Sequence, residues 1–198
     1  SLPDLPGHHK GEAMFELVEE DNEFVLWDGN DGDEQFKVKI IGTILKQSAC
    51  AAIAKTTTGK IGSTPWGVHA QKNIGLSVIR AGRELTLAKG YFSKSVEPYE
   101  ARWCGIEIQF PPALDKVFGV TNNKQHAVNL KPLDITKDWS DEGFNSQKEY
   151  EADLEANKDP KLQIYRLIGK VNKMIATLEN RLKDLDFENK TIVDLGAG

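Results

Sequence analysis

Lys124 is the residue whose type and setting first suggest chemistry. It lies in the polar run Val120–His126, among the amides Asn122, Asn123 and Gln125. A lysine ammonium is a compact positive charge that binds phosphate oxygens, and side-chain amides donate further hydrogen bonds. The pattern predicts an anion site on a loop, with Lys124 as its cation. An ordinary exposed turn has the same composition, so the elements around the loop decide how it is interpreted.

The residues before this loop predict a strand and a short helix that would position it. In Trp103–Phe110 apolar and polar residues alternate, which is typical of a half-buried strand. Pro111 and Pro112 end that strand, because proline cannot continue a hydrogen-bonded ladder. Ala113–Phe118 has room for one or two helical turns, and Gly119 stands where a left-handed C-terminal cap is expected.

A second informative stretch, Trp66–Leu85, leads into a predicted β-hairpin. Its strands are Gly75–Arg80 and Glu84–Ala88, and Ala81-Gly82 supplies the reversal between them. Four side chains around the hairpin are candidates for contact with an anion or a partner domain, namely His69, Lys72, Arg80 and Arg83. Solubility explains the two arginines equally well.

These two stretches resemble the second domain of GHKL ATPases, the group that includes DNA gyrase B subunits, MutL and the Hsp90 chaperones. Asn123-Lys124-Gln125, preceded by a strand and a short helix, is similar to the Asn-Lys-Gln loop of the MORC-type members. Trp66–Leu85 resembles the hairpin of their bacterial relatives. In that group an ATP-binding domain is followed by a transducer domain of the ribosomal-S5-like fold, and a transducer lysine contacts the γ-phosphate. One departure is Asn122, where MORC proteins commonly carry histidine.

The resemblance implies a division of labour with a preceding domain. That domain of the same polypeptide would hold ATP and Mg²⁺, so we do not expect this chain to bind ATP well or to hydrolyse it by itself. Lys124 would act on the γ-phosphate, and Asn122, Asn123 and Gln125 would shape the loop or bind phosphate. The interface with the ATP-binding domain would include His69, Lys72, Arg80 and Arg83.

The expected fold is α+β, with a mostly antiparallel sheet that carries short helices on one face. We assign residues 1–135 to the transducer domain and residues 136–198 to a helical arm. Further strands are expected early in the chain and a helix after them, in this order: Ala13–Val18, Glu23–Trp27, Phe36–Leu45 and the helix Gln47–Lys55.

The arm contains two helices with clear start signals. Ser146 followed by Glu149 is a capping box, and Asp159-Pro160 places a capping aspartate before a proline at the first helical position. The second helix, about residues 160–186, carries an apolar seam at alternating spacings of about four and three residues. The seam predicts packing along another helix, which would give a coiled coil and a homodimer, or packing on the chain's own sheet.

Composition places the chain among globular proteins, since 39% of its residues are hydrophobic and 28% are charged. No run approaches the roughly 18 apolar residues that span a bilayer. The net charge of −5 argues against direct nucleic-acid binding by this chain, which leaves nucleic acid as a partner of the full-length protein alone. Cys50 and Cys104 lack metal-ligand spacing and are interpreted as buried thiols of a reducing, cytoplasmic compartment.

Two glycine-containing stretches need an interpretation. Thr56–Gly62 contains Gly-Lys but lacks the first glycine and the following Ser or Thr of a phosphate loop, so a flexible connection is preferred. Asp194–Gly198 has the spacing of an ATP-site glycine box and of a methyltransferase motif, and we interpret it as the broken end of a longer polypeptide. The function predicted is that of a transducer fragment. The alternative is a non-catalytic interaction module, in which a sheet domain carries a coiled-coil arm.

Overall fold

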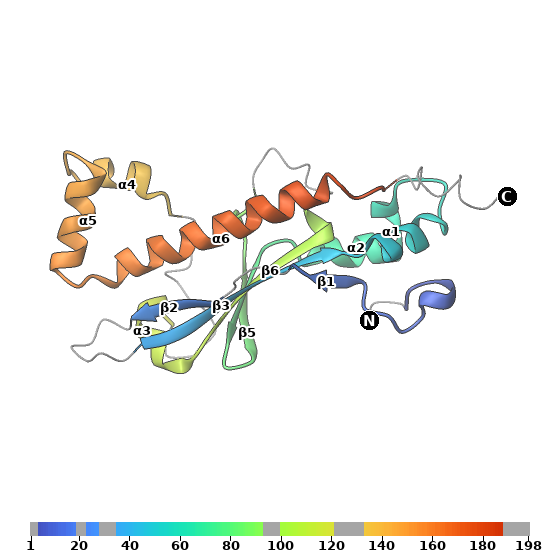
Figure 1. The fold of residues 1–198 in the computed structure, drawn as a ribbon, viewed down its shortest axis with the longest axis horizontal. Coiled ribbons are helices and arrows are strands. Elements are labelled where there is room, and N and C mark those ends of the chain that lie inside the picture. Colours follow the sequence, from blue (N-terminus) through green and yellow to red (C-terminus); the bar gives the residue numbers. More distant parts are fainter. Residues whose placement is uncertain (1–3, 19–22, 28–34, 93–99, 121–132, 188–198) are drawn as a thin grey trace.

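The computed structural model describes residues 4–18, 23–27, 35–92, 100–120 and 133–187 of the 198-residue chain. Helices and strands follow one another without a regular βαβ repeat, and one long helix lies across the sheet (Figure 1). The protein is therefore α+β, as predicted from the sequence.

The described strands form one open sheet in the order β1-β3-β6-β4-β5, with β2 paired to β3 as well. Four of the five strand pairs are antiparallel, and only β4 and β6 run parallel, which confirms the mostly antiparallel sheet. The strands are β1 (Phe15–Leu17), β2 (Glu23–Trp27), β3 (Gln35–Leu45), β4 (Leu76–Arg80), β5 (Arg83–Ala88) and β6 (Cys104–Phe110).

The helices of the described residues fall before, between and after these strands. The α-helices are α1 (Gln47–Ala54), α2 (Pro65–Lys72), α3 (Asp115–Phe118), α4 (Ile135–Asp141), α5 (Gln147–Ala156) and α6 (Pro160–Leu182). Short 3-10 helices are η1 (Gly7–His9), η2 (Ile61–Ser63), η3 (Ala101–Trp103) and η4 (Pro112–Leu114).

One face of the sheet carries the hydrophobic core. On β6, alternate residues from Cys104 to Phe110 are buried, and their neighbours on β3 and β4 in the same register are buried too, apart from the half-buried Arg80 at the end of β4. α6 packs on this face, mainly against β3 and β6. A glycine marks the closest approach: a Cβ atom on Gly42 would lie 2.6 Å from the sulfur of Met174. The helix can lie this close to β3 because position 42 has no side chain.

The seam of α6 is thus used inside the chain. Ten of its side chains are buried, and eight of these belong to the same cluster as the sheet. The start signals predicted for the helix are confirmed, since Asp159 caps it by accepting a hydrogen bond from the Lys161 amide and Pro160 is its first residue. The helix ends at Leu182, slightly earlier than expected. Of the two predicted uses of the seam, packing on the chain's own sheet is the one that the structure contains.

A second, smaller cluster joins α4 and α5 to the start of α6. Its buried members are Tyr150, Leu154, Leu162 and Tyr165. α5 begins at the predicted capping box: the Ser146 hydroxyl accepts from the Glu149 amide, and the Glu149 carboxylate accepts from the Asn145 amide. The division of the chain at residue 135 stays a prediction.

The hairpin and both cysteines agree with the sequence. β4 and β5 are joined by Ala81 and Gly82, whose φ values of 48° and 78° are those of a tight hairpin turn.

Cys50 and Cys104 are buried free thiols, and burial raises the pKa of Cys104 to about 12. In the part of the chain that is described, no helix has the length and apolar composition needed to cross a membrane. The predicted terminal motif, residues 194–198, lies outside the described residues.

Candidate functional site

The loop that carries Lys124 lies outside the described residues, together with Asn122, Asn123 and Gln125. The structure describes the elements on both sides of it, which end at Val120 and resume at Leu133. These flanks determine how firmly the two ends of the segment are held.

The flank before the loop is firmly packed. Phe118 at the end of α3 is fully buried and stacks on Phe110 of β6, with ring centroids 4.0 Å apart. Gly119 then caps α3 in the left-handed conformation at φ 64°, as the sequence predicted. The next amide, that of Val120, donates a 2.8 Å hydrogen bond to the carbonyl of Asp115. The chain therefore leaves α3 in one defined direction.

Arg80 ties this flank to the hairpin. Its Nε and Nη2 atoms donate to the two carboxylate oxygens of Asp115 at 2.6 and 2.8 Å. This two-point geometry is the strongest form of an arginine–carboxylate pair, and the hydrogen bond that Arg80 donates to Asp115 raises the pKa of Arg80. The ion pair joins the two sequence stretches that carry the resemblance, because Arg80 ends β4 and Asp115 begins α3.

The flank after the loop leads into α4. Asp134 caps this helix by accepting from the Thr136 amide at 3.1 Å, and the hydrogen bond from the Thr136 hydroxyl is the main cause that lowers the pKa of Asp134. Leu133 is half-buried and packs against both hydrophobic clusters. Each end of the Lys124 segment is thus attached to packed structure.

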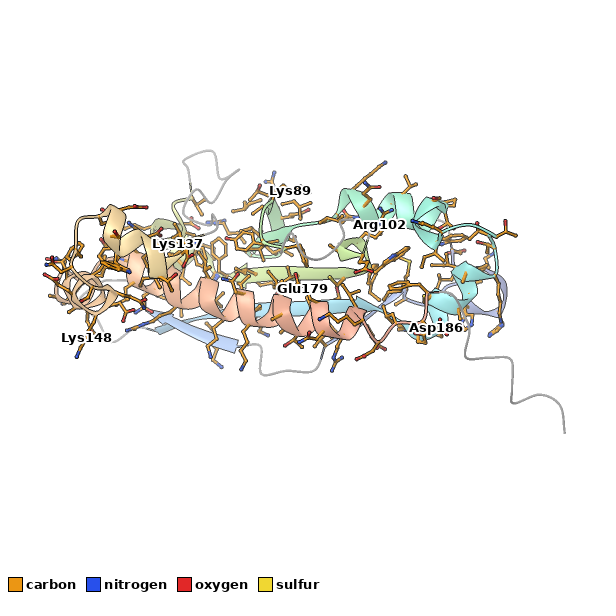
Figure 2. All side chains as sticks on the ribbon, turned by 90° about the horizontal axis from the view of Figure 1, so that it is seen from above. Lys89, Arg102, Lys137, Lys148, Glu179 and Asp186 are labelled. Carbon is orange, nitrogen blue, oxygen red and sulfur yellow. The ribbon has the colours of Figure 1, made fainter. Side chains whose placement is uncertain are left out.

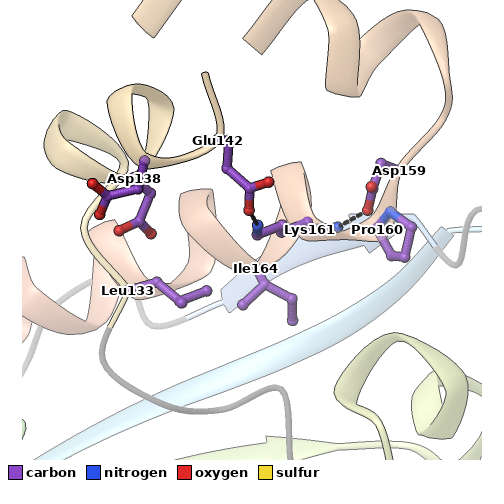
Figure 3. Close-up of a pocket in the computed structure, with 8 residues that line it drawn as sticks. Leu133, Asp138, Glu142, Asp159, Pro160, Lys161 and Ile164 are labelled. Atoms are coloured by element: carbon purple, nitrogen blue, oxygen red, sulfur yellow. Dashed lines mark hydrogen bonds and ion pairs between the residues drawn. The ribbon is translucent and has the colours of Figure 1, made fainter. Parts of the chain in front are cut away.

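A pocket of about 660 Å³ lies beside Leu133, between α4 and the first turns of α6 (Figure 3). One ion pair crosses it, in which Lys161 donates to Glu142 at 2.6 Å, and the Tyr165 hydroxyl donates to the lining residue Asp138 at 2.7 Å. Burial acts to lower the pKa of Lys161, but the hydrogen bond to Glu142 and the nearby Tyr150 outweigh it and raise that pKa. We interpret the pocket as part of the polar interface that holds α4 against α6.

The remaining predicted interface residues fall into two groups. Arg83 is exposed at the tip of the hairpin, near Arg80 in sequence. His69 and Lys72 lie in the last turn of α2, which packs on η2 and η3 and not on α3. The structure therefore brings Arg80 to the flank of the Lys124 loop, and it keeps His69 and Lys72 on a different element.

The sequence analysis missed α2 and the side chain that holds it. Thr64 followed by Pro65 is a start signal that was available, and Thr64 does cap the helix by accepting from the Gly67 amide. Arg102 is only 8% exposed and donates through Nη1 to the carbonyls of Gly62 and Gly67, at 2.8 and 3.3 Å. The sequence around Arg102 does not predict its burial, because arginine is ordinarily an exposed residue.

Comparison with known proteins does not supply a family. No protein-family model, no curated protein and no solved structure matches the chain. Within the described residues there is also no cluster of His, Cys, Asp or Glu side chains suited to a metal ion.

Proposed function

We propose that this chain is the transducer domain of a GHKL-type ATPase and that Lys124 contacts the γ-phosphate of ATP held by a preceding domain of the same polypeptide. The observation that supports this best is the Arg80–Asp115 ion pair. It joins the hairpin stretch to the α3 flank of the lysine loop, and these are the two stretches on which the resemblance rests. A phosphate contact that depends on the nucleotide state requires a lysine loop that starts from a firmly packed element.

The physical logic of such a contact is differential binding. An ammonium bound to the γ-phosphate interacts with ATP and has no partner after hydrolysis to ADP. A contact made in one nucleotide state shifts a two-domain equilibrium by its differential free energy and no more, and couplings of this kind are typically about 1–3 kcal/mol. Asn122, Asn123 and Gln125 would orient the loop or add hydrogen bonds, and Mg²⁺ would accompany the nucleotide in the preceding domain.

The test is ATP turnover by the full-length protein with Lys124→Ala. Loss of a hydrogen bond to a charged group is worth about 1.5–3 kcal/mol, so we expect kcat/KM for ATP to fall by about 10- to 100-fold. Lys116→Ala is the matched control, because Lys116 is an exposed lysine on the neighbouring α3. Unchanged turnover in Lys124→Ala, with the control also unchanged, would remove Lys124 from the nucleotide site.

The second candidate is the non-catalytic interaction module, and one observation favours it. No helix of the described residues covers the second face of the sheet, where Leu17 is 65% exposed and Ile41 and Leu87 are half-buried. Ile41 and Leu87 line a shallow hollow with Thr43 and Glu107. If this face binds a partner and Lys124 is incidental, Leu17→Asp abolishes partner binding and ATP turnover stays independent of Lys124.

A further inference from the structure

A second open groove, of about 1060 Å³, lies between α1, α2 and η3. Figure 1 shows α1 and α2 at the end of the molecule opposite α3 and α4, and Figure 2 shows Arg102 at the same end as Asp186. The groove is therefore far from both flanks of the Lys124 loop. Its polar walls come from Thr57, Thr58, Lys60, Ser63, Glu100 and Arg102.

The groove contains a buried guanidinium whose hydrogen-bonding capacity is only partly used. Nη1 of Arg102 holds the carbonyls of Gly62 and Gly67. Nε is enclosed and has no hydrogen-bond partner among the described residues. Nη2 likewise has no acceptor in that part of the chain. Nη2 is not among the enclosed atoms, so it is the guanidinium nitrogen that a ligand in the groove can reach, and a charged N–H group is a strong donor to phosphate oxygens.

The charge of Arg102 is also uncompensated within the described chain. None of the described carboxylates forms an ion pair with it, although Glu100 lines the same groove. Burial alone is the cause that lowers the pKa of Arg102. A buried charge without a counterion is unfavourable, and fastening two carbonyls uses only one of the three guanidinium nitrogens. The structural role accounts for Nη1, and it leaves the charge of the group and the accessible Nη2 available to a ligand.

The backbone around Arg102 is packed so that the guanidinium keeps its position. A Cβ atom on Gly67 would lie 2.5 Å from the carbonyl oxygen of Gly62, and one on Gly62 would lie 3.1 Å from Nη1 of Arg102. Glycine at both positions lets η2, α2 and the guanidinium approach one another closely. Preorganisation of this kind reduces the entropy lost when a ligand binds.

We propose that this groove binds the phosphate group of a small soluble molecule, with Arg102 as its principal charged contact. Thr58 and Ser63, whose side chains carry hydroxyl groups, line the same groove, and so does the positively charged Lys60. A concave groove with one buried cation suits a compact phosphate ester better than an extended polyanion, whose recognition needs a basic surface. The site does not depend on Lys124.

Pyrophosphate is the probe that tests the site. We would titrate it into the ¹⁵N-labelled chain at constant ionic strength and follow the Nε–H signal of Arg102 and the amide signals of Gly59 and Gly62. The expected result is a saturable shift confined to the groove. Arg102→Lys should weaken binding by about 10- to 100-fold, whereas Arg166→Lys, on the exposed side of α6, and Lys124→Ala should leave it unchanged.

Arg102→Lys also removes bonds to Gly62 and Gly67, so a variant that spares them is needed. Thr58→Val does so and should weaken pyrophosphate binding by about 3- to 10-fold, the loss of one neutral hydrogen bond. Shifts that do not saturate, or that sodium chloride reproduces at equal ionic strength, would overturn the proposal. So would full affinity in a folded Arg102→Lys protein, or binding that is lost in Lys124→Ala.

Discussion

Packing of α6 on the sheet predicts a strong coupling between Gly42 and Met174. A Cβ atom at position 42 would lie 2.6 Å from Sδ and 3.2 Å from Cγ of Met174, and 3.4 Å from Leu178. Overpacking of this kind costs about 1–3 kcal/mol, and the lower backbone entropy of unfolded alanine returns about 0.5–1 kcal/mol. Gly42→Ala should therefore lower the free energy of unfolding by up to about 2.5 kcal/mol.

The same geometry predicts that the two substitutions compensate each other. Met174→Ala alone creates a cavity and should cost about 2–5 kcal/mol. In the double variant the new methyl group enters the space that the methionine leaves, so the loss should be smaller than the sum by about 1 kcal/mol or more. Urea unfolding of the four proteins, followed by circular dichroism, measures this coupling.

Gly169→Ala is the control for this cycle. Gly169 lies on the exposed side of α6, and a methyl group added there would have no neighbour within 4 Å. Alanine at this position should therefore stabilise the helix by about 0.5–1 kcal/mol. Strict additivity of Gly42→Ala and Met174→Ala, or midpoints that rise with protein concentration, would refute the intramolecular packing of α6 and favour the coiled-coil interpretation.

Three further predictions follow from individual contacts. Asp115→Ala removes the ion pair with Arg80 and should accelerate hydrogen exchange at the Val120 amide, as measured by NMR. Ser146→Ala removes the cap of α5 and should cost about 0.5–2 kcal/mol in urea unfolding. Burial raises the pKa of the Cys104 thiol in the folded protein to about 12. The neutral thiol therefore contributes to stability below the unfolded pKa of about 8.5, and this contribution is lost as the pH rises from there toward about 12. The free energy of unfolding of Cys104→Ala should lack that loss.

Each of these has an outcome that contradicts it. Unchanged exchange in Asp115→Ala would mean that α3 is held without the ion pair. A Ser146→Ala protein as stable as wild type would mean that the cap contributes nothing to folding. Comparing wild type with Cys104→Ala separates the effect of Cys104 from that of the lysines and tyrosines that titrate in the same range. Identical pH profiles of the free energy of unfolding above about pH 8.5 would contradict the raised pKa of Cys104.

Local signals in this sequence predicted local structure well. Caps and turns depend on one or two residues whose backbone preferences hold in most surroundings, which is why Ser146, Asp159, Gly119 and the Ala81-Gly82 turn were correctly interpreted. Strand β6 was also predicted correctly, because its alternating apolar and polar residues reflect a sheet that is covered on one face only.

Long-range packing was not predictable in the same way. The seam of α6 fits another helix and a sheet equally well, and only the position of Gly42 on β3 decides between them. The contact of Arg102 with Gly62 and Gly67 joins residues 40 and 35 positions apart, and nothing in the local composition encodes it. The predicted roles of Asn122 through Gln125 remain predictions, since they concern residues beyond the described ranges.

The packing of α6 limits how nucleotide state could be relayed. Eight of its side chains are buried in the cluster that includes the sheet, and each contributes about 1.5–3 kcal/mol by burial. Detaching the helix would therefore cost on the order of 10–20 kcal/mol, even after allowance for a compact unfolded reference. The proposed γ-phosphate contact supplies only about 1–3 kcal/mol, far too little to release α6 as a free arm. If the chain transmits nucleotide state, the sheet and α6 must move together as one rigid body, and the surface that changes partners is an outer one.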